Sequence, residues 1–532
     1  MKLSKRLIFV NAHRLAFLRP TWTCREEITV PEVEPGVMPM HMEYRGNLFM
    51  HAYEEGRNVA DAMAAFVFGA WDGLERFNTI DVVQIMSNEE MVKTRNWKLR
   101  LEKTFDCWTV DPPQDLLVCW HVKPLTPPGD IGRDSFRLSL FSISHGTPIL
   151  DDEYLWLTPS EVDRARSRLI EVHILGDLLG AMVISSGGTK VELMLILWRE
   201  RRVVARLRRE FAGDMRSKGF MLLACNSFIL AVADANEGNN CFALEVYRVP
   251  HSDECFDDKI PVTPVLAARY VLPTLRPDLR PVSIIVSSTN SSGLYRDTEC
   301  PKPFSASQSE SMLAVTLIHM KRRPESIMDI GAKRFLVFIH PSTFLSAMAL
   351  EQSSAEPRTY EWDAWGPDAT RWFMLHSTFR AVHGYRAVFA HCIVDFNPLE
   401  VARALQLVDD GDGESHASMG LQAGPVLEMA DQVSLADESD TVSEDDNGSQ
   451  DDGSDGPERG LVVMICIEDT IIEAGEDFVE DVVSRLPYRE VRCEAPVDCG
   501  KLWGGEDWIG VETDDDDRPQ LLRVLSYKPG RH

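Results

Sequence analysis

The residues of this chain whose types and spacing could do chemistry are few and scattered. His391 and Cys392 are adjacent, and Asp395 follows three residues later. These are the residue types of a Cys/His nucleophile pair. However, adjacent residues on a strand point to opposite faces of a sheet, so the two side chains would not reach each other there. We therefore interpret Cys392 as a buried cysteine of a β-strand.

Two other segments contain candidate metal ligands. The acidic string 410–414 (DGDGE) resembles the start of a calcium loop, but Ser415 stands where the tight turn needs glycine and Leu421 where a bidentate glutamate belongs. Cys493 and Cys499 are close in sequence but lack two further ligands at a zinc spacing. We expect no metal and no cofactor, and we interpret 410–414 as a solvated acidic loop.

The common enzyme signatures are missing from the sequence. It contains no GxxxxGK[ST], GxGxxG, GxSxG, HExxH or CxxC motif. No catalytic, cofactor-binding or metal-binding residue is therefore assigned, and no single binding residue stands out. The sequence indicates a protein that is not an enzyme.

The run 198–211 (WRERRVVARLRREF) is the one dense basic patch, with six arginines and two glutamates. The simpler interpretation is a solvated strand and turn at a sheet edge, where charge discourages edge-to-edge aggregation. The functional hypothesis is that Arg201, Arg202, Arg208 and Arg209 dock an acidic partner or the chain's own acidic segment.

The elements that must position all these residues are mostly strands. A unit recurs in which an apolar strand, a turn and an alternating strand end on an aromatic residue. In the best copies, Ile174–Ser185 precedes Leu193–Trp198, and Gly219–Ala233 precedes Phe242–Val249. Such units in series are typical of a β-propeller. We predict a mainly all-β, propeller-like fold with WD-repeat-like blades and a few short helices.

Further strands and three helices are predicted from local patterns. The other strand segments are Ile80–Met86, Trp108–Val110, Leu116–Val122, Phe136–Ile143, Leu313–Ile318, Phe335–Ile339 and Leu461–Ile467. Helix starts are predicted at Thr158–Glu161, which reads as a capping box, and at Asn397-Pro398. A third helix is predicted over Glu476–Arg485, where apolar residues form a stripe at helical spacing.

The chain divides into four segments. Residues 1–41 are an irregular lead-in with several prolines, 42–408 form the propeller-like region, 409–458 are a disordered acidic insertion, and 459–532 continue the propeller-like region. The insertion has too few apolar residues to offset the entropy of ordering it. Four of its hydroxyl residues have an acidic residue three positions later, which leaves phosphorylation as a minority hypothesis. They are Ser434, Thr441, Ser443 and Ser449.

Charge and composition limit the partners. The net charge is −28, and residues 408–458 contain 16 acidic residues and no Lys or Arg, so the remainder carries −12. Without clustered cations nucleic acid is not an expected partner. No apolar stretch reaches the roughly 18–20 residues that span a bilayer, so we expect no membrane association. The 11 scattered cysteines fit reduced thiols. We expect a monomer in the cytoplasm or nucleus.

Several segments together resemble the F-box proteins of mushroom-forming (basidiomycete) fungi, in which a propeller-like region follows the F-box. The segments occur in order over most of the chain: 13–17 (HRLAF), 111–117 (DPPQDLL), 195–198 (LILW), 244–247 (LEVY), 365–367 (WGP), 371–373 (RWF), 383–386 (HGYR), 395–398 (DFNP), 486–489 (LPYR) and 505–510 (GEDWIG). The resemblance implies a substrate receptor, whose F-box docks on the adaptor of a cullin-type ubiquitin ligase while the propeller-like region captures a target. We expect this chain to lack the F-box itself, because the residues before Arg14 leave no room for its apolar helical pattern. Docking to the adaptor is therefore in question for this chain.

The sequence as a whole predicts a non-enzymatic protein-interaction scaffold that resembles the substrate-receptor region of an F-box ubiquitin-ligase subunit. Its partner is a protein of unknown identity, contacted by inter-strand loops at the ends of the propeller. Two alternatives stay open. One is a propeller-type hydrolase with carboxylates at the central channel, and the other is a truncated remnant without ligase attachment.

Overall fold

The computed structural model gives the fold of most of the chain. It describes residues 8–9, 23–29, 41–45, 48–55, 76–87, 92–123, 135–150, 154–159, 167–185, 190–210, 216–217, 219–236, 239–250, 261–287, 311–322, 332–345, 357–374, 379–389, 392–399, 401–402, 461–493, 501–504, 508–512 and 521–526.

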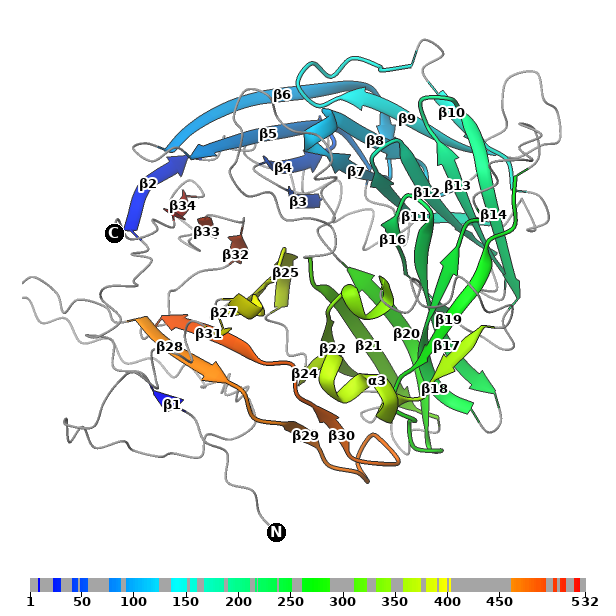
Figure 1. Ribbon diagram of the computed structural model, residues 1–532. Coiled ribbons are helices and arrows are strands. Elements are labelled where there is room, and N and C mark those ends of the chain that lie inside the picture. The colour runs from blue at the N-terminus through cyan, green and yellow to red at the C-terminus, as the bar shows by residue number, and fades with distance from the viewer. Residues whose placement is uncertain are drawn as a thin grey trace, which may run out of the picture.

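The described strands form seven sheets of four to six strands and one separate two-stranded hairpin. The seven sheets follow one another around a ring, and each sheet extends from the middle of the ring toward its rim (Figure 1). Within a sheet, successive strands mostly turn back on each other and pair antiparallel. This arrangement is a β-propeller, as the sequence predicted. We call the sheets blades I to VII in chain order.

Blades I to III have four strands each. Blade I contains β3 (His41–Arg45), β4 (Leu48–Tyr53), β5 (Phe77–Ser87) and β6 (Val92–Phe105). Blade II contains β7 (Cys107–Asp111), the short 3-10 helix η2 (Pro112–Gln114), β8 (Leu116–Trp120), β9 (Phe136–Ser142) and β10 (Tyr154–Leu157). Blade III contains β11 (Arg168–Leu175), β12 (Leu178–Ile184), β13 (Lys190–Leu197) and β14 (Arg202–Glu210).

Blades IV and V each take up a fifth strand from a connection. Blade IV contains β16 (Phe220–Ala224), β17 (Ser227–Asn236), β18 (Asn239–Arg248), β19 (Val265–Val271) and, paired parallel to β19, β23 (Arg358–Tyr360). Blade V contains β20 (Leu279–Ser287), β21 (Leu313–Lys321), β22 (Lys333–Ile339), β24 (Thr370–Met374) and, paired parallel to β20, β15 (Arg216–Ser217). Helix α3 (Trp362–Ala369) joins β23 to β24.

Blades VI and VII combine strands from the N-terminal and C-terminal regions of the chain. Blade VI contains β25 (Phe379–His383), β26 (Arg386–Phe389), β27 (Cys392–Asp395), β31 (Tyr488–Cys493), β28 (Leu461–Cys466) and β1 (Ile8–Phe9). Blade VII contains β32 (Lys501–Gly504), β33 (Trp508–Glu512), β34 (Leu521–Ser526) and β2 (Thr23–Thr29). The separate hairpin is β29 (Thr470–Ile472) with β30 (Val482–Ser484).

The core lies between the faces of neighbouring blades. In β13, Leu193 and Leu195 pack into the cluster shared with blade IV, while Met194 and Ile196 pack into the cluster shared with blade II. Alternate residues of a strand point to opposite faces, so a strand that packs against a blade on each side can be apolar at successive positions. This geometry explains the continuous apolar run LMLILW.

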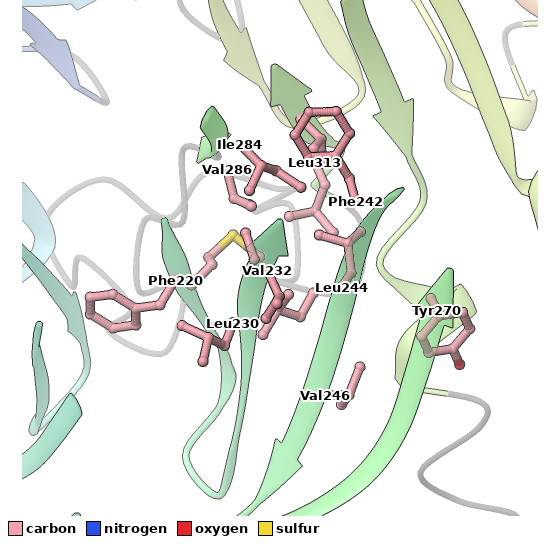
Figure 2. Close-up of a cluster of buried hydrophobic side chains, with 14 of the residues drawn as sticks. Phe220, Leu230, Val232, Phe242, Leu244, Val246, Tyr270, Ile284, Val286 and Leu313 are labelled. Carbon is pink, nitrogen blue, oxygen red and sulfur yellow. The ribbon is translucent and has the colours of Figure 1, made fainter. Parts of the chain in front are cut away.

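The largest apolar cluster joins blades III, IV and V, and Figure 2 shows the part of it between blades IV and V. Its labelled side chains come from four strands of blade IV and two strands of blade V. They are Phe220, Leu230, Val232, Phe242, Leu244, Val246, Tyr270, Ile284, Val286 and Leu313. Adjacent blades are therefore held to each other by buried hydrocarbon and aromatic surface.

The recurring unit of the sequence is confirmed with a corrected internal structure. The stretch Gly219–Ala233 is not one strand, because the chain reverses at Cys225 and Asn226 between β16 and β17. Likewise, Ile174–Ser185 contains the turn at Gly176 that joins β11 to β12. Both strands next to these tight turns are buried and apolar, so the hydrophobicity of the sequence does not reveal the turns.

The helix predictions have mixed outcomes. A helix does begin at residue 398, after Asn397. The helix over Glu476–Arg485 is wrong, because this segment is the turn of the β29–β30 hairpin and β30 itself. The helix predicted from Thr158–Glu161 falls on residues mostly outside those described.

Two of the four predicted segments need comment. Residues 1–41, expected to be irregular, contain β1 and β2, which pair with strands near the C-terminus. Prolines 31, 35 and 39 come after β2 and so do not interrupt it. The insertion 409–458, with its candidate calcium loop and phosphorylation sites, lies outside the described residues.

Candidate interaction face

Four turns of blades II and III lie at one end of the ring, because antiparallel strands return their first and third turns to the same end. They are residues 112–115, 142–149, 176–177 and 198–201. We call this surface the turn face. It belongs to the class of inter-strand loop where the sequence analysis expected contacts.

A single backbone carbonyl ties three of these turns together. The Gly176 oxygen accepts hydrogen bonds from Gln114 Nε2 at 2.8 Å and from Trp198 Nε1 at 3.2 Å. Gly176 has φ +57°, a left-handed conformation that glycine adopts without a Cβ penalty. Gln114 also donates to Asp111 Oδ2 at 2.6 Å. The turns of blades II and III are thus fixed relative to each other.

Charged side chains cover this framework. Arg199 Nε donates to Asp177 Oδ1 at 2.6 Å, and its guanidinium lies 4.2 Å from the centre of the Trp198 ring. Arg202 pairs with Glu200 at 2.8 Å. The Arg199, Asp177 and Glu200 side chains are about half exposed, at 48%, 49% and 57%. The turn face therefore presents ordered cations and carboxylates to solvent over a buried tryptophan.

A cluster of Ser, His and Asp side chains lies on the same face. Asp115 accepts hydrogen bonds from the Ser144 backbone N and the Ser144 Oγ, both at 2.7 Å, and from the Ser142 hydroxyl. His145 Nδ1 lies 2.7 Å from Ser144 Oγ. These are the residue types of a hydrolytic triad, so their order decides what they can do.

The order of the hydrogen bonds shows that the cluster holds a loop in place. In a Ser-His-Asp triad the imidazole lies between the carboxylate and the hydroxyl and accepts the hydroxyl proton. Here Ser144 donates its single proton to Asp115, so its oxygen accepts the remaining bond from His145 Nδ1–H. An imidazole that is protonated at this nitrogen cannot act as the base for that serine. The cluster fixes residues 142–146 onto the β7–β8 turn.

Blade III also contains an acid–base pair. On the innermost strand β11, Glu171 Oε1 lies 2.8 Å from His173 Nε2. The other Glu171 oxygen accepts from the Phe220 backbone N of blade IV at 3.3 Å, and the His173 ring packs edge-on against Phe220 at 4.7 Å. The pair joins two inner strands. Within the described part of the chain, no group of three or more His, Cys, Asp or Glu side chains could hold a metal ion.

The basic run forms the turn 198–201 and β14, the last strand in the pairing order of blade III. Two of its arginines point between blades. Arg206 Nη1 binds the fully buried Glu192 of β13 at 2.9 Å and the Thr158 carbonyl after blade II at 3.1 Å. Arg209 Nη2 binds the fully buried Glu245 of blade IV at 2.7 Å. These two cations hold neighbouring blades together.

Glu245 has a complete set of partners. Arg209 contacts both of its oxygens, Arg269 lies 3.3 Å away, and the Tyr247 hydroxyl donates at 2.6 Å. Burial and the adjacent carboxylate raise the pKa of Tyr247, so its hydroxyl keeps its proton and acts as donor. The segment LEVY, one of those that carry the family resemblance, is therefore part of an ion-pair network between blades.

Three other resembling segments meet in blade VI. Asp395, from DFNP, is 2% exposed and accepts from Arg386 Nε of HGYR at 3.2 Å and Arg489 Nη2 of LPYR at 3.1 Å. Both arginines stand directly opposite Asp395 across the strand pairs. Asp395 also accepts from the Asn397 N at 3.0 Å at the start of the helix. These motifs position each other.

The remaining candidates can be placed only in part. Cys392 is 7% exposed and lies in the apolar cluster of blade VI, which confirms its interpretation as a core cysteine. His391, Cys499 and the calcium-like string lie outside the described residues, and the side chain of Cys493 is not described. The sequence missed the interlocking of Gln114 with Gly176 and of Arg209 with Glu245. A carboxylate inside an otherwise apolar strand, as in KVELMLIL and FALEVYR, was the available signal for the ion pairs.

Comparison with known proteins adds little to this description. No protein-family model and no curated protein matches the chain. Among solved structures, the WD40 domain of SCAP from fission yeast aligns with 96% of this chain and 99% of that chain, at 8% sequence identity and a TM-score of 0.31. Because a TM-score of 0.31 is too low to carry a structural argument, the propeller assignment rests on the strand pairing. Among the described residues, none forms a helix long and apolar enough to cross a bilayer.

Proposed function

We propose that this chain is a non-enzymatic protein-interaction scaffold that binds a protein partner through the turn face of blades II and III. The observation that carries the proposal is the Gly176 carbonyl, which ties three turns together beneath half-exposed charged side chains. Turns that are already fixed lose little conformational entropy on binding, so little of the binding free energy is used to order them. The proposed setting is the cytoplasm or nucleus.

Affinity capture tests this proposal with a matched pair of variants. Wild-type chain is compared with the double variant Arg199→Glu/Arg202→Glu, which changes one residue of the turn 198–201 and the residue that directly follows it. The control is Lys190→Glu, a charge reversal at the opposite end of the same blade, where the side chain is 51% exposed. We expect captured proteins that are lost with the double variant and kept with the control. Capture of no partner by wild type, or equal capture by all three, would show that the proposal is wrong.

The family resemblance supports a finer proposal, that the scaffold is the substrate-receptor part of a cullin-type ubiquitin ligase. The same capture experiment separates the two levels. Recovery of the ligase adaptor and cullin together with a turn-face partner would support the receptor role. A turn-face partner without adaptor or cullin would leave the scaffold proposal intact and remove the ligase proposal.

A further inference from the structure

The β29–β30 hairpin presents a small sheet at the rim of blade V, outside β24 (Figure 1). Its strands pair antiparallel with Ile471 opposite Val483. One side of the hairpin faces the blade and the other faces solvent, as the alternation of its side chains shows.

The inner side is firmly attached to the blade. Val482 and Ser484 are buried, and Ser484 Oγ accepts from the Trp372 backbone N at 3.3 Å. The chain leaving β30 is bound as well, because Arg485 N donates to the Pro367 carbonyl at 2.6 Å and Leu486 N donates to the Thr370 carbonyl at 3.1 Å.

The turn of the hairpin is anchored at its far end. Asp477 is 3% exposed and accepts from Lys333 Nζ at 3.0 Å, with His319 Nε2 at 3.5 Å. Burial lowers the pKa of His319, which favours the neutral ring in this position. Phe478 packs between Phe335 and Trp372, with ring centres at 5.3 and 5.5 Å. The hairpin is thus a rigid platform.

The outer side of β29 and its flanks alternates apolar and acidic residues. Ile467, Asp469, Ile471 and Glu473 are all exposed, while the residues between them are partly covered. Ile467 is 45% and Ile471 42% exposed, which is high for isoleucine in a sheet. The strands of the described residues pair with β29 only on its β30 side. Among the described residues, no strand covers its other edge, which can pair with an additional strand.

The charge of this edge selects the kind of strand. Residues 467–485 contain seven Asp or Glu and one cation, Arg485. That cation is already held by Asp368 and Asp469, each at 3.2 Å. A neutral or acidic segment would gain no charge pairing here. A Lys or Arg opposite Glu473 would gain a cross-strand pair, and one opposite Asp469 would share that carboxylate with Arg485.

We propose that the open edge of β29 binds an extended basic segment of a partner protein by strand addition. The segment places Lys or Arg opposite Asp469 and Glu473 and an apolar residue opposite Ile471, so its pattern is basic–x–apolar–x–basic. The inference rests on the proposed function as a protein-interaction scaffold and adds a second surface to it. Because β29 is three residues long, the complex is weak and sensitive to salt.

Fluorescence anisotropy with the full chain tests the proposal directly. The probe is a fluorescein-labelled capped peptide, Thr-Lys-Thr-Val-Thr-Lys-Thr. One control peptide has both lysines replaced by glutamate, and a second has the same composition with the two lysines adjacent. We expect saturable binding of the probe that weakens as NaCl is raised, with little binding of either control. Equal binding of the two lysine peptides would overturn the alternating pairing.

Variants of the chain locate the site. Ile471→Thr keeps a β-branched residue, and we expect it to weaken binding about two- to fivefold. Glu473→Lys should weaken it further by reversing a charge. Val479→Thr is the matched control, because Val479 is 51% exposed on the same hairpin but lies in its turn. An equal loss with Val479→Thr would contradict the proposal.

Two further comparisons separate this inference from other outcomes. The turn-face variant Arg199→Glu/Arg202→Glu should bind the peptide as wild type does, so failure of either surface leaves the other testable. Tighter binding by a chain lacking residues 1–20, by tenfold or more, would mean that the chain's own basic N-terminal segment occupies the edge. That result would overturn the assignment to a separate partner.

Discussion

At the scale of single residues, Glu245 explains what the basic run does in the folded chain. A fully buried carboxylate is tolerated only when its charge and its hydrogen-bonding oxygens are satisfied. Arg209 supplies this from the edge of blade III, with Arg269 and Tyr247 from blade IV completing the set. The cation is therefore required for packing of the two blades, whatever it contributes at the surface.

This geometry predicts unequal costs for two charge reversals on β14. Arg209→Glu places a second carboxylate beside the buried Glu245, and we expect a loss of about 3 kcal/mol or more in the free energy of unfolding. Arg202→Glu removes a pair with the 57% exposed Glu200, and we expect a loss of about 1 kcal/mol or less. Urea denaturation of both variants measures the difference.

The stability of these two variants also tests the hypothesis that the basic run 198–211 docks an acidic partner. A variant that reverses Arg201, Arg202, Arg208 and Arg209 together mixes surface charge with an inter-blade contact, so a loss of partner capture would not be specific. If Arg209→Glu proves as stable as Arg202→Glu, the ion pair with Glu245 is not formed in solution. The arginines would then again be candidates for binding an acidic partner.

At the scale of elements, helix α3 is the part of the rim that is most constrained by shape. Trp365 Nε1 donates to the Val271 carbonyl at 3.1 Å, and the Trp362 ring packs edge-on against Trp365 and Trp372 at 5.4 and 5.6 Å. The helix thereby connects the outer strands of blades IV and V. Gly366, in the segment WGP, lies against the Trp362 ring, where a larger residue would not fit.

Gly366→Ala should destabilise the propeller for steric reasons alone. A Cβ at this position would lie 2.2–2.4 Å from three ring atoms of Trp362, and that ring has buried neighbours on its other sides. We expect a loss of about 1–3 kcal/mol, the usual range for overpacking. Tryptophan fluorescence during urea denaturation reports it, since Trp362 and Trp372 are part of the site.

Asp363→Ala serves as the control in the same helix, because Asp363 is exposed and its replacement should change the stability by about 0.5 kcal/mol or less. Should both alanine variants unfold at the same urea concentration, the contact of Gly366 with Trp362 would not be formed as described.

Elements were predictable where one local pattern had one structural meaning. The alternation in Phe136–Ile143 predicted β9, and Asn397-Pro398 predicted a helix start that Asn397 Oδ1 indeed caps through the Leu399 N. The stripe in Glu476–Arg485 had two meanings. Phe478 and Val482 are four apart and both buried, as on a helix, but Gly475 at φ +102° and the Ala474–Asp481 hydrogen bond form a hairpin turn instead.

The candidate site was less predictable than the fold. Its defining contacts join Gln114 to Gly176 and Arg199 to Asp177, which are 62 and 22 residues apart in sequence. No local pattern contains such pairs, because they depend on which turns the ring brings together. The buried Glu245 was visible as a carboxylate in an apolar strand, but its partner Arg209 is 36 residues away and was read as surface charge.

At the scale of the whole molecule, the ring depends on a strand from each end of the chain. A propeller forms a closed ring when its last blade packs against its first. Here β2 supplies the outer strand of blade VII, pairing Thr23 with Ser526 and Thr29 with Leu521. Contacts between β2 and β6 bring blade VII next to blade I. Strand β2 of the N-terminal segment is therefore part of blade VII.

Truncation tests whether this closure stabilises the ring. A chain that lacks residues 1–35 loses β2 and leaves β34 as an open edge, so we expect a lower melting temperature and self-association on size-exclusion chromatography. With six residue pairs lost, the stability decrease should be of the order of several kcal/mol. A chain that lacks only residues 1–20 keeps β2 and loses the two-residue β1, so it should melt close to the full chain and elute with it.

Addition of a synthetic peptide of residues 21–31 should partly restore the melting temperature of the longer truncation. Equal melting of both truncations would mean that blade VII holds the ring closed without β2.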